Sequence, residues 1–480
     1  MTDTSKQKAE IIYEPKKINY GALLNDDTVE WLAAMPLLVL STIPLVVFVL
    51  RFAEENYATL QQFLDPVRVL FCLFAGITAL VCIATAVRDK QKPSAIISGN
   101  KPFLLFAAFL LLMLISYLVV GKPFFDDPFN HLGINSSETH IMYIMFFTVY
   151  FFLGSRIRSP KIKGLIIHFN VLISFIIASF GLVDCYIAPL RPFRLTQIWD
   201  GCFPGVWSNP NHYGYYLTLM TLLSVGMLLY EKERSWKIFG LVSSAVHCVT
   251  MVLNDTFGSY LAIWFGFVFL IIVNIIIFRK FPLLLLIPAA VLLLASIFLP
   301  TWAGSMGQNF AALGQDTVSI VNNDENAGLA GSVRWTLWRT AAEGIMESPI
   351  FGQGLEGWAD ILLERSTTGI HPHNEYLQYA LFFGIPAACC YIAGLVAVFL
   401  RGLFNRKKLD GLTLMCLAAA FGYCVSAFFG NPKFYTAPYF FMILGFAYNY
   451  CLAAKESTGS AKAADTGAEE AAAQENVANS

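Results

Sequence analysis

Twelve apolar stretches, each close to the length that crosses a lipid bilayer, constrain the fold of this sequence more than any other feature. They cover 31–50, 67–87, 102–120, 139–154, 164–184, 211–230, 236–253, 257–278, 282–299, 374–400, 411–429 and 434–453. A helix needs roughly 20 mostly apolar residues to span the hydrocarbon, because its backbone amides must be satisfied internally. Only 14% of the 480 residues are charged, too few to cover a soluble protein of this size. We therefore expect an all-α polytopic membrane protein with about 12 transmembrane helices.

The positions of the basic residues predict the orientation of these helices. If the N-terminus is cytoplasmic, 23 of the 32 lysines and arginines fall on the cytoplasmic side of the membrane. Short cytoplasmic loops are enriched in both residue types. We therefore expect a multi-pass protein of the cytoplasmic (inner) membrane, with both termini in the cytoplasm.

This topology divides the chain into five parts. They are a cytoplasmic N-terminal segment at 1–30, transmembrane helices 1 to 9 in 31–299, a large extracytoplasmic loop at 300–373, transmembrane helices 10 to 12 in 374–454 and a tail at 455–480. The N-terminal segment lacks the cleavage pattern of a signal sequence, so we expect the first helix to stay in the mature protein. The tail is rich in Ala, Glu, Ser and Gly, which predicts a disordered cytoplasmic tail.

Two of the ten cysteines, Cys185 and Cys202, fall outside the apolar stretches. Both face the oxidising side in this topology, so a disulfide between them is one alternative and two free thiols are the other. The remaining eight lie inside predicted helices, where cysteine packs as a small apolar side chain.

The loop at 300–373 is long enough to suggest a function of its own. Its first part, between Gly304 and Gly328, is rich in Gly and Asn and predicts an irregular, mobile segment. Its second part predicts a helix that starts at Arg334. The apolar positions of that helix are Trp335, Trp338, Ala342 and Ile345. We expect it to lie along the membrane surface with its tryptophans at headgroup level, leaving Arg334 and Arg339 on its polar side.

Polar side chains cluster where the tenth apolar stretch enters the lipid, at His371, His373, Asn374 and Glu375. Such groups are costly there unless they are used or paired. Three uses compete: Asn374 caps the helix, the two histidines bind a metal, or a histidine is catalytic. Capping is compatible with either of the others. The sequence shows no third ligand cluster with the usual spacing, which argues against a metal.

Four short motifs accompany the large loop. They are Arg334-x-x-x-Trp338, Pro349-x-x-Gly352-x-Gly354, the run HPHNEYLQYALFFGIP at 371–386, and Asn209-Pro210-Asn211-His212 at the start of the sixth helix. Together with the twelve-helix layout and the outer loop, these motifs resemble the bacterial O-antigen ligase and polymerase superfamily. The run at 371–386 is weak evidence alone and strong evidence after such a loop.

The resemblance implies a membrane glycosyltransferase of cell-envelope polysaccharide biosynthesis that uses no metal and no other cofactor. Its donor would be a polyprenyl-diphosphate-linked glycan in the lipid bilayer, and its acceptor a hydroxyl of a glycan, a lipid or a protein. Nucleic acid is not an expected partner. Transfer would take place at the outer face of the cytoplasmic membrane, and a single displacement would invert the anomeric carbon.

The resemblance also implies roles for individual residues. His373 would be the base that removes the acceptor proton. Arg334 would stabilise the diphosphate leaving group, since a guanidinium can hold phosphate oxygens with two hydrogen bonds. Asn374 and Glu375 would orient His373 or hold sugar hydroxyls. The other expected substrate-binding residues are His371, Asn211 and Arg339.

One position departs from the family pattern. Many members carry a Ser-Arg-Gly-like segment at the outer start of the eighth helix, whose arginine binds the diphosphate. Here the corresponding residues 254–259 read NDTFGS, with Phe257 in the place of the arginine. Either another cation substitutes or the donor differs. The available replacements are Arg191, Arg194 and Lys433.

The alternative function is a polytopic transporter or flippase for a lipid-linked or small solute. Ion-coupled transporters keep ionisable groups near the bilayer midplane. Here the ionisable groups gather at the outer ends of the predicted helices, at Asp184, Asp255, Arg334, His373 and Glu375. This distribution favours chemistry at the interface. A ligase and a polymerase need the same base and the same diphosphate clamp, so the sequence does not distinguish them, nor does it identify the sugar.

Overall fold

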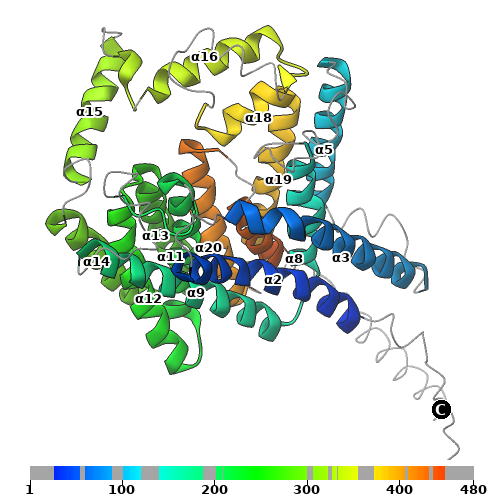
Figure 1. Cartoon of the computed structure of the whole chain (residues 1–480), viewed down its shortest axis with the longest axis horizontal. Helices are drawn as coiled ribbons and strands as arrows, with labels where there is room; N and C mark the ends of the chain where they lie inside the picture. Colours follow the sequence, from blue (N-terminus) through cyan, green and yellow to red (C-terminus); the bar gives the residue numbers. More distant parts are fainter. Residues whose placement is uncertain are drawn as a thin grey trace, which may run out of the picture.

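A computed structural model describes most of the chain. The described residues are 26–53, 60–88, 101–120, 140–186, 202–207, 209–299, 306–322, 327–331, 333–354, 372–404, 406, 409–431 and 436–448. Every regular element among them is helical, which confirms the all-α class (Figure 1).

Nine helices in the described part of the chain are long and apolar enough to cross a bilayer, so this is a multi-pass membrane protein. They lie within α2 (Asp26–Ala53), α3 (Leu60–Arg88), α5 (Lys101–Val120), α9 (Pro160–Tyr186), α11 (Pro210–Tyr230), α12 (Arg234–Asn254), α13 (Phe257–Phe278), α19 (Ile385–Phe404), and α20 (Gly411–Ser426) with its 3-10 extension η6 (Ala427–Phe429).

The other three expected spans also form helices, but shorter or irregular ones. They are α7 (His140–Met145) with the π-helix η1 (Phe146–Phe151) and α8 (Phe152–Arg156); η3 (Leu283–Leu285) with α14 (Leu286–Phe298); and the helix Ala437–Tyr448. The count of twelve transmembrane helices and the orientation of the termini therefore stay predictions.

Helix α11 forms the centre of the bundle. Nearly every residue from Tyr213 to Leu228 is buried, and α11 packs against α12, α13 and α20. Gly226 lies so close to α20 that a Cβ there would overlap the side chain of Met415. Small residues at such crossings let helix backbones approach closely in lipid, where no hydrophobic effect drives helices together. The centre is thus a tightly packed support for the elements at its ends.

The expected helix at 374–400 is broken into α18 (Glu375–Phe383) and α19. Gly384 separates them with φ +89°, a conformation that favours glycine, and a Cβ there would overlap the Ile350 carbonyl. The turn at 348–354 replaces the backbone hydrogen bonds that the break frees. Gln353 N donates to Leu381 O (2.7 Å) and Ile385 N donates to Pro349 O (2.8 Å). The glycine motif after Pro349 therefore serves to dock this turn on the break.

The first part of the large loop contains α15 (Met306–Asn322), so the prediction of an irregular segment is wrong for these residues. Phe310 packs against the rings of Phe257 and Tyr260 at the start of α13, with centroids 5.1 and 6.1 Å apart. Asn309 Nδ2 also donates to Asp255 Oδ1 (3.3 Å). Gly and Asn weaken a helix by at most about 1 kcal/mol per residue, a loss that these contacts help to offset.

The second part of the loop contains the 3-10 turn η4 (Ala327–Leu329) and α16 (Arg334–Glu347), which confirms the helix predicted from Arg334. Its buried apolar stripe is Leu337, Ala341 and Ile345, whereas Ala342 is exposed. The expected apolar face was therefore correct at Ile345 and wrong at Ala342. Figure 1 shows α15 and α16 together at one end of the bundle, with α18 beneath α16. A position at the membrane surface remains a prediction.

Candidate functional site

His373 and Asn374 form the junction between the large loop and α18. Asn374 Oδ1 accepts hydrogen bonds from the backbone N–H groups of Tyr376 and Leu377 (both 3.0 Å), which confirms the predicted N-cap. His373 is half-buried and has φ +48°, a region that few non-glycine residues adopt. Backbone held in such a region concentrates at functional sites, where the surrounding fold fixes it.

Arg334 starts α16, and the residue before it has a positive φ angle, as His373 does. Val333 has φ +64°, which is unusual for a β-branched side chain. Arg334 Nη1 donates to Gly331 O (3.3 Å). Its Nε is buried and has no hydrogen-bond acceptor among the described residues. The first residue of α16 thus keeps a donor that the described protein leaves unused.

Trp338 adds another unused donor on the same face of α16. Its indole Nε1 is buried without an acceptor in the described part of the chain. Arg334 and Trp338 stand four residues apart, so their side chains are neighbours on the helix. A buried donor without a partner costs about 1–3 kcal/mol. A bound ligand with oxygen acceptors would remove that cost for both groups.

Helices α16 and α18 lie side by side and run in the same direction. Near their starts, the rings of Trp338 and Tyr376 both contact Phe428 of η6, with centroids 5.4 and 6.4 Å apart. Near their ends, Gln353 Nε2 donates to Gly344 O (2.8 Å) while its backbone N–H bonds to α18. The N-terminal ends of both helices therefore open toward one region. Helix N-termini carry partial positive charge and favour anions.

Helix α11 also reaches this region. The Tyr215 hydroxyl donates to Phe429 O (3.3 Å) and lies within electrostatic range of both Arg334 and Glu375. The ring of His212 is 6.4 Å from that of Tyr215. Asn209 caps α11 by accepting from Asn211 N (2.8 Å), so the Asn-Pro-Asn motif is an N-cap. The first turns of three helices, α11, α16 and α18, thus surround the candidate site.

Glu375 points into the protein, with only 1% of its surface exposed. Its Oε1 accepts a hydrogen bond from the Tyr391 hydroxyl of α19, and the Tyr379 hydroxyl of α18 also interacts with the carboxylate. Tyr376, next in sequence, donates to Cys424 O (2.7 Å). Buried to this degree, Glu375 is placed to fix the start of α18 rather than to meet solvent.

Phe257, which replaces the arginine of the family pattern, serves an apolar contact. Its ring lies against Phe310 of α15 and stacks with Tyr260, 6.4 Å away. The neighbouring Asp255 has φ +53° and accepts from Asn309, so this corner carries a carboxylate beside the ring. The phenylalanine at this position thus has a structural use, which is to dock α15.

The remaining expected site residues divide into two groups. Arg339 is described and lies on the exposed face of α16, with 67% of its side chain exposed and Nε 3.5 Å from Glu343 Oε1. The structure therefore does not bring Arg339 together with Arg334. Four expected site residues lie outside the described residues: His371, Arg191, Arg194 and Lys433. The side chain of Cys185 does too, so its disulfide with Cys202 stays a prediction.

Within the described residues, no group of three His, Cys, Asp or Glu side chains could hold a metal ion. Tyr215 is not among the site residues predicted from the sequence, and Trp338 is predicted there only as a membrane-surface residue. The spacing of Trp338 from Arg334 could have indicated a shared helix face. Tyr215 follows His212 in the Asn-Pro-Asn motif by three residues and could have been found in the same way.

Comparison with known proteins agrees with the motifs. Residues 241–392 match the family model described as O-antigen ligase. The matched segment begins in α12 and ends in α19, so it contains Phe257, Arg334, Trp338 and His373. None of the curated proteins matches the sequence.

Proposed function

We propose that this chain, an enzyme of the O-antigen ligase family by its residues 241–392, transfers a polyprenyl-diphosphate-linked glycan to an acceptor hydroxyl. The reaction takes place at the outer face of the cytoplasmic membrane, and both termini are cytoplasmic. The observation that carries the proposal is the pair of buried donors, Arg334 Nε and Trp338 Nε1, which have no acceptor in the described part of the chain and lie beside the start of α18. A diphosphate supplies the oxygen acceptors that these groups lack.

His373 is the general base in this proposal. It removes the proton of the acceptor hydroxyl as the hydroxyl oxygen attacks the anomeric carbon. The bond between that carbon and the diphosphate oxygen breaks, and its electron pair stays on the diphosphate. The products are the glycosylated acceptor, the polyprenyl diphosphate and a protonated His373. The configuration of the anomeric carbon inverts, because the base and the leaving group are on opposite faces of the sugar.

Arg334 stabilises the charge that develops on the leaving group. Its guanidinium and the N-terminal ends of α16 and α18 offer a fixed positive environment, which needs little reorganisation during the reaction. Asn374 supports His373 by holding the first turn of α18, as its two backbone hydrogen bonds indicate. Glu375 supports the same turn from the interior through Tyr391. Asn211, in the first turn of α11, is a candidate for contacts with sugar hydroxyls.

A second cation completes the proposed diphosphate clamp. Phe257 supplies no charge, and its ring packs against Phe310 of α15. Arg191 and Arg194 are the first candidates, because in the predicted topology their loop precedes α11 on the same side of the membrane as His373. Lys433 is the next candidate. A diphosphate bound near lipid needs charge-assisted hydrogen bonds from more than one group.

The test is a transfer assay with purified protein in lipid nanodiscs. A lipid-linked glycan is supplied with either a lipid acceptor or a second lipid-linked repeat, in the presence of a chelator. A ligase adds one glycan to the lipid acceptor, whereas a polymerase produces a ladder of lengthened repeats. In the same assay, Arg191→Ala or Arg194→Ala should depress transfer, with only partial rescue by Lys. Absence of transfer to every acceptor, from a donor that still binds, would contradict the proposal.

A further inference from the structure

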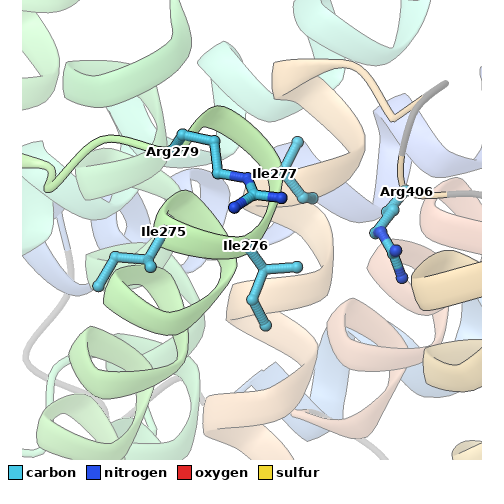
Figure 2. A pocket seen from close by; sticks show the side chains of 5 residues that line it. All are labelled: Ile275, Ile276, Ile277, Arg279 and Arg406. Atoms are coloured by element: carbon cyan, nitrogen blue, oxygen red, sulfur yellow. The ribbon is translucent and has the colours of Figure 1, made fainter.

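A cavity of about 410 Å³ lies at the end of the bundle opposite the candidate site. Its lining residues are Ile275, Ile276, Ile277, Arg279 and Arg406 (Figure 2). Helix α13 starts beside Asp255 at the site and runs for 22 residues, about 33 Å, before it ends at the cavity. Arg406 follows α19, which likewise starts near the site and ends here. The cavity and the candidate site are therefore separate.

Two guanidinium groups dominate the charge of this cavity. Arg279 and Arg406 are exposed, and neither forms an ion pair with a carboxylate among the described residues. Asp410, the acidic residue nearest in sequence, instead caps α20 by accepting from Thr413 N (2.8 Å). Arg401, one turn before the end of α19, is held over the ring of Tyr448 at 5.3 Å. Arg279 and Arg406 thus remain available for an anion.

The backbone conformation of Arg279 sets the point at which its side chain leaves α13. It has φ +57° and ends α13 in the left-handed conformation, which turns the chain out of the helix at this residue. In Figure 2, Arg279 extends from the end of α13, and Ile276 and Ile277 lie between it and Arg406. The cavity therefore has a basic rim and an apolar wall.

The apolar wall belongs to a surface that faces lipid. Ile275 is 47% exposed and Ile276 44% exposed, and the exposed side chains continue along α13 and α19 with Phe278, Leu403 and Phe404. Cavities of this size accommodate small ligands, and a wall of this kind accommodates an acyl chain. A soluble anion would use only the rim.

The C-terminal ends of α13 and α19 both lie at the cavity, so an anion needs the positive charge of the arginines to bind there. The C-terminal end of a helix carries partial negative charge and disfavours an anion. Both α13 and α19 end here. An anion can bind only where added positive charge outweighs both helix ends, so each arginine should contribute strongly and neither should suffice alone.

We propose that this cavity binds the phosphate of an anionic glycerophospholipid from the adjacent leaflet. Arg279 and Arg406 contact the phosphate oxygens, and Ile275, Ile276 and Ile277 contact the first part of an acyl chain. Basic pockets between transmembrane helices at the cytoplasmic side recognise anionic headgroups in this way. The site is distinct from the proposed donor site, and it holds a structural or regulatory lipid rather than a substrate.

The experiment measures lipid binding to the full chain in detergent by native mass spectrometry. Phosphatidylglycerol and phosphatidylcholine with identical acyl chains are titrated separately, and inorganic phosphate is added alone. The wild-type protein should bind phosphatidylglycerol about tenfold or more tightly than phosphatidylcholine. The double variant Arg279→Gln/Arg406→Gln should lose this preference. Arg234→Gln, an exposed arginine at the start of α12 on the same end, is the matched control and should keep it.

The single variants keep the test decisive if the double variant does not fold. Arg279→Gln and Arg406→Gln should each lose most of the preference, because the helix ends oppose the anion. Unchanged preference in both single variants would overturn the proposal, and so would equal loss in Arg234→Gln. If inorganic phosphate alone displaces bound phosphatidylglycerol at comparable concentration, the site binds a soluble anion and the lipid assignment is wrong.

Discussion

Helix α11 differs in its packing from the loop-bearing end of the bundle, which consists of α15, α16 and the start of α18. In α11 nearly every residue from Tyr213 to Leu228 is buried, and close packing leaves no room for a side chain at Gly226. At the other region, two buried donors of α16 have no acceptor among the described residues, and Val333 and His373 hold positive φ angles. The centre is closely packed, although the hydroxyls of Tyr213 and Tyr216 are also buried there without a hydrogen-bond partner among the described residues. The loop-bearing end differs in combining unused donors with strained backbone, and natural proteins retain such features where a ligand uses them.

The two regions should respond differently to substitution. Substitutions in α11 should lower stability, whereas substitutions at the site should lower transfer and leave stability unchanged or raised. Each variant below is therefore measured both for transfer and for its thermal denaturation midpoint in detergent.

The largest effect is expected at His373. His373→Ala should cut transfer by about 100-fold or more, the scale of a lost general base. His373→Asn should do the same, and because Asn tolerates the left-handed conformation, its denaturation midpoint should match or exceed that of the wild type. Near-normal transfer by either variant would remove His373 from the catalytic role.

Arg334 should come next. Arg334→Gln should reduce transfer by about 10- to 100-fold, and Arg334→Lys should recover only part of it because a single ammonium lacks the planar fork. Arg339→Gln should have a far smaller effect, since Arg339 faces outward and pairs with Glu343. Equal losses for the two arginines of α16 would show that the helix acts through its total charge rather than through a directed contact.

Gly226 tests the packed centre of α11. Gly226→Ala places a methyl group against Met415, and such overpacking costs about 1–3 kcal/mol. The denaturation midpoint should fall, while the transfer rate of the folded fraction should stay close to that of the wild type. A specific loss of transfer without a change in the midpoint would mean that the packed centre of α11, and not only its first turn, takes part in the chemistry.

Trp338 should give the smallest effect. Trp338→Phe keeps a ring against Phe428 and removes only the Nε1 donor. Losing one hydrogen bond of about 1 kcal/mol should reduce transfer roughly fivefold. The midpoint should not fall, because the donor has no acceptor among the described residues. A lower midpoint with unchanged transfer would assign Trp338 to the packing of α16 instead.

The sequence predicted features that depend on local composition. Apolar length located the nine long spans, the cap at Asn374 followed from the residue type, and the motifs identified the family segment that contains Arg334 and His373. These signals are local, because a span, a cap and a motif are each encoded by neighbouring residues. The roles of the two residues in the reaction remain predictions.

Features that depend on distant contacts could not be predicted in this way. The break at Gly384 exists because the turn at 348–354 docks there, and both sides of the break are apolar. Helix α15 forms where Phe310 meets Phe257, two rings more than fifty residues apart in sequence. His247, buried in α12 with Nδ1 3.2 Å from Ser224 Oγ, gave no signal among its apolar neighbours. Such partners become visible only when the helices are placed together.

The contact between Phe257 and Phe310 has a consequence for how related sequences should vary. An arginine at position 257 would lose the ring contact that Phe257 now makes with Phe310. The residues at position 257, at the start of α13, and at position 310, in α15, should therefore change together. Relatives with an aromatic residue at position 257 should carry an aromatic residue at position 310. Relatives with arginine at position 257 should lack an aromatic residue at position 310. In this chain the two rings are in contact, so the sequence difference at position 257 would be matched by one at position 310.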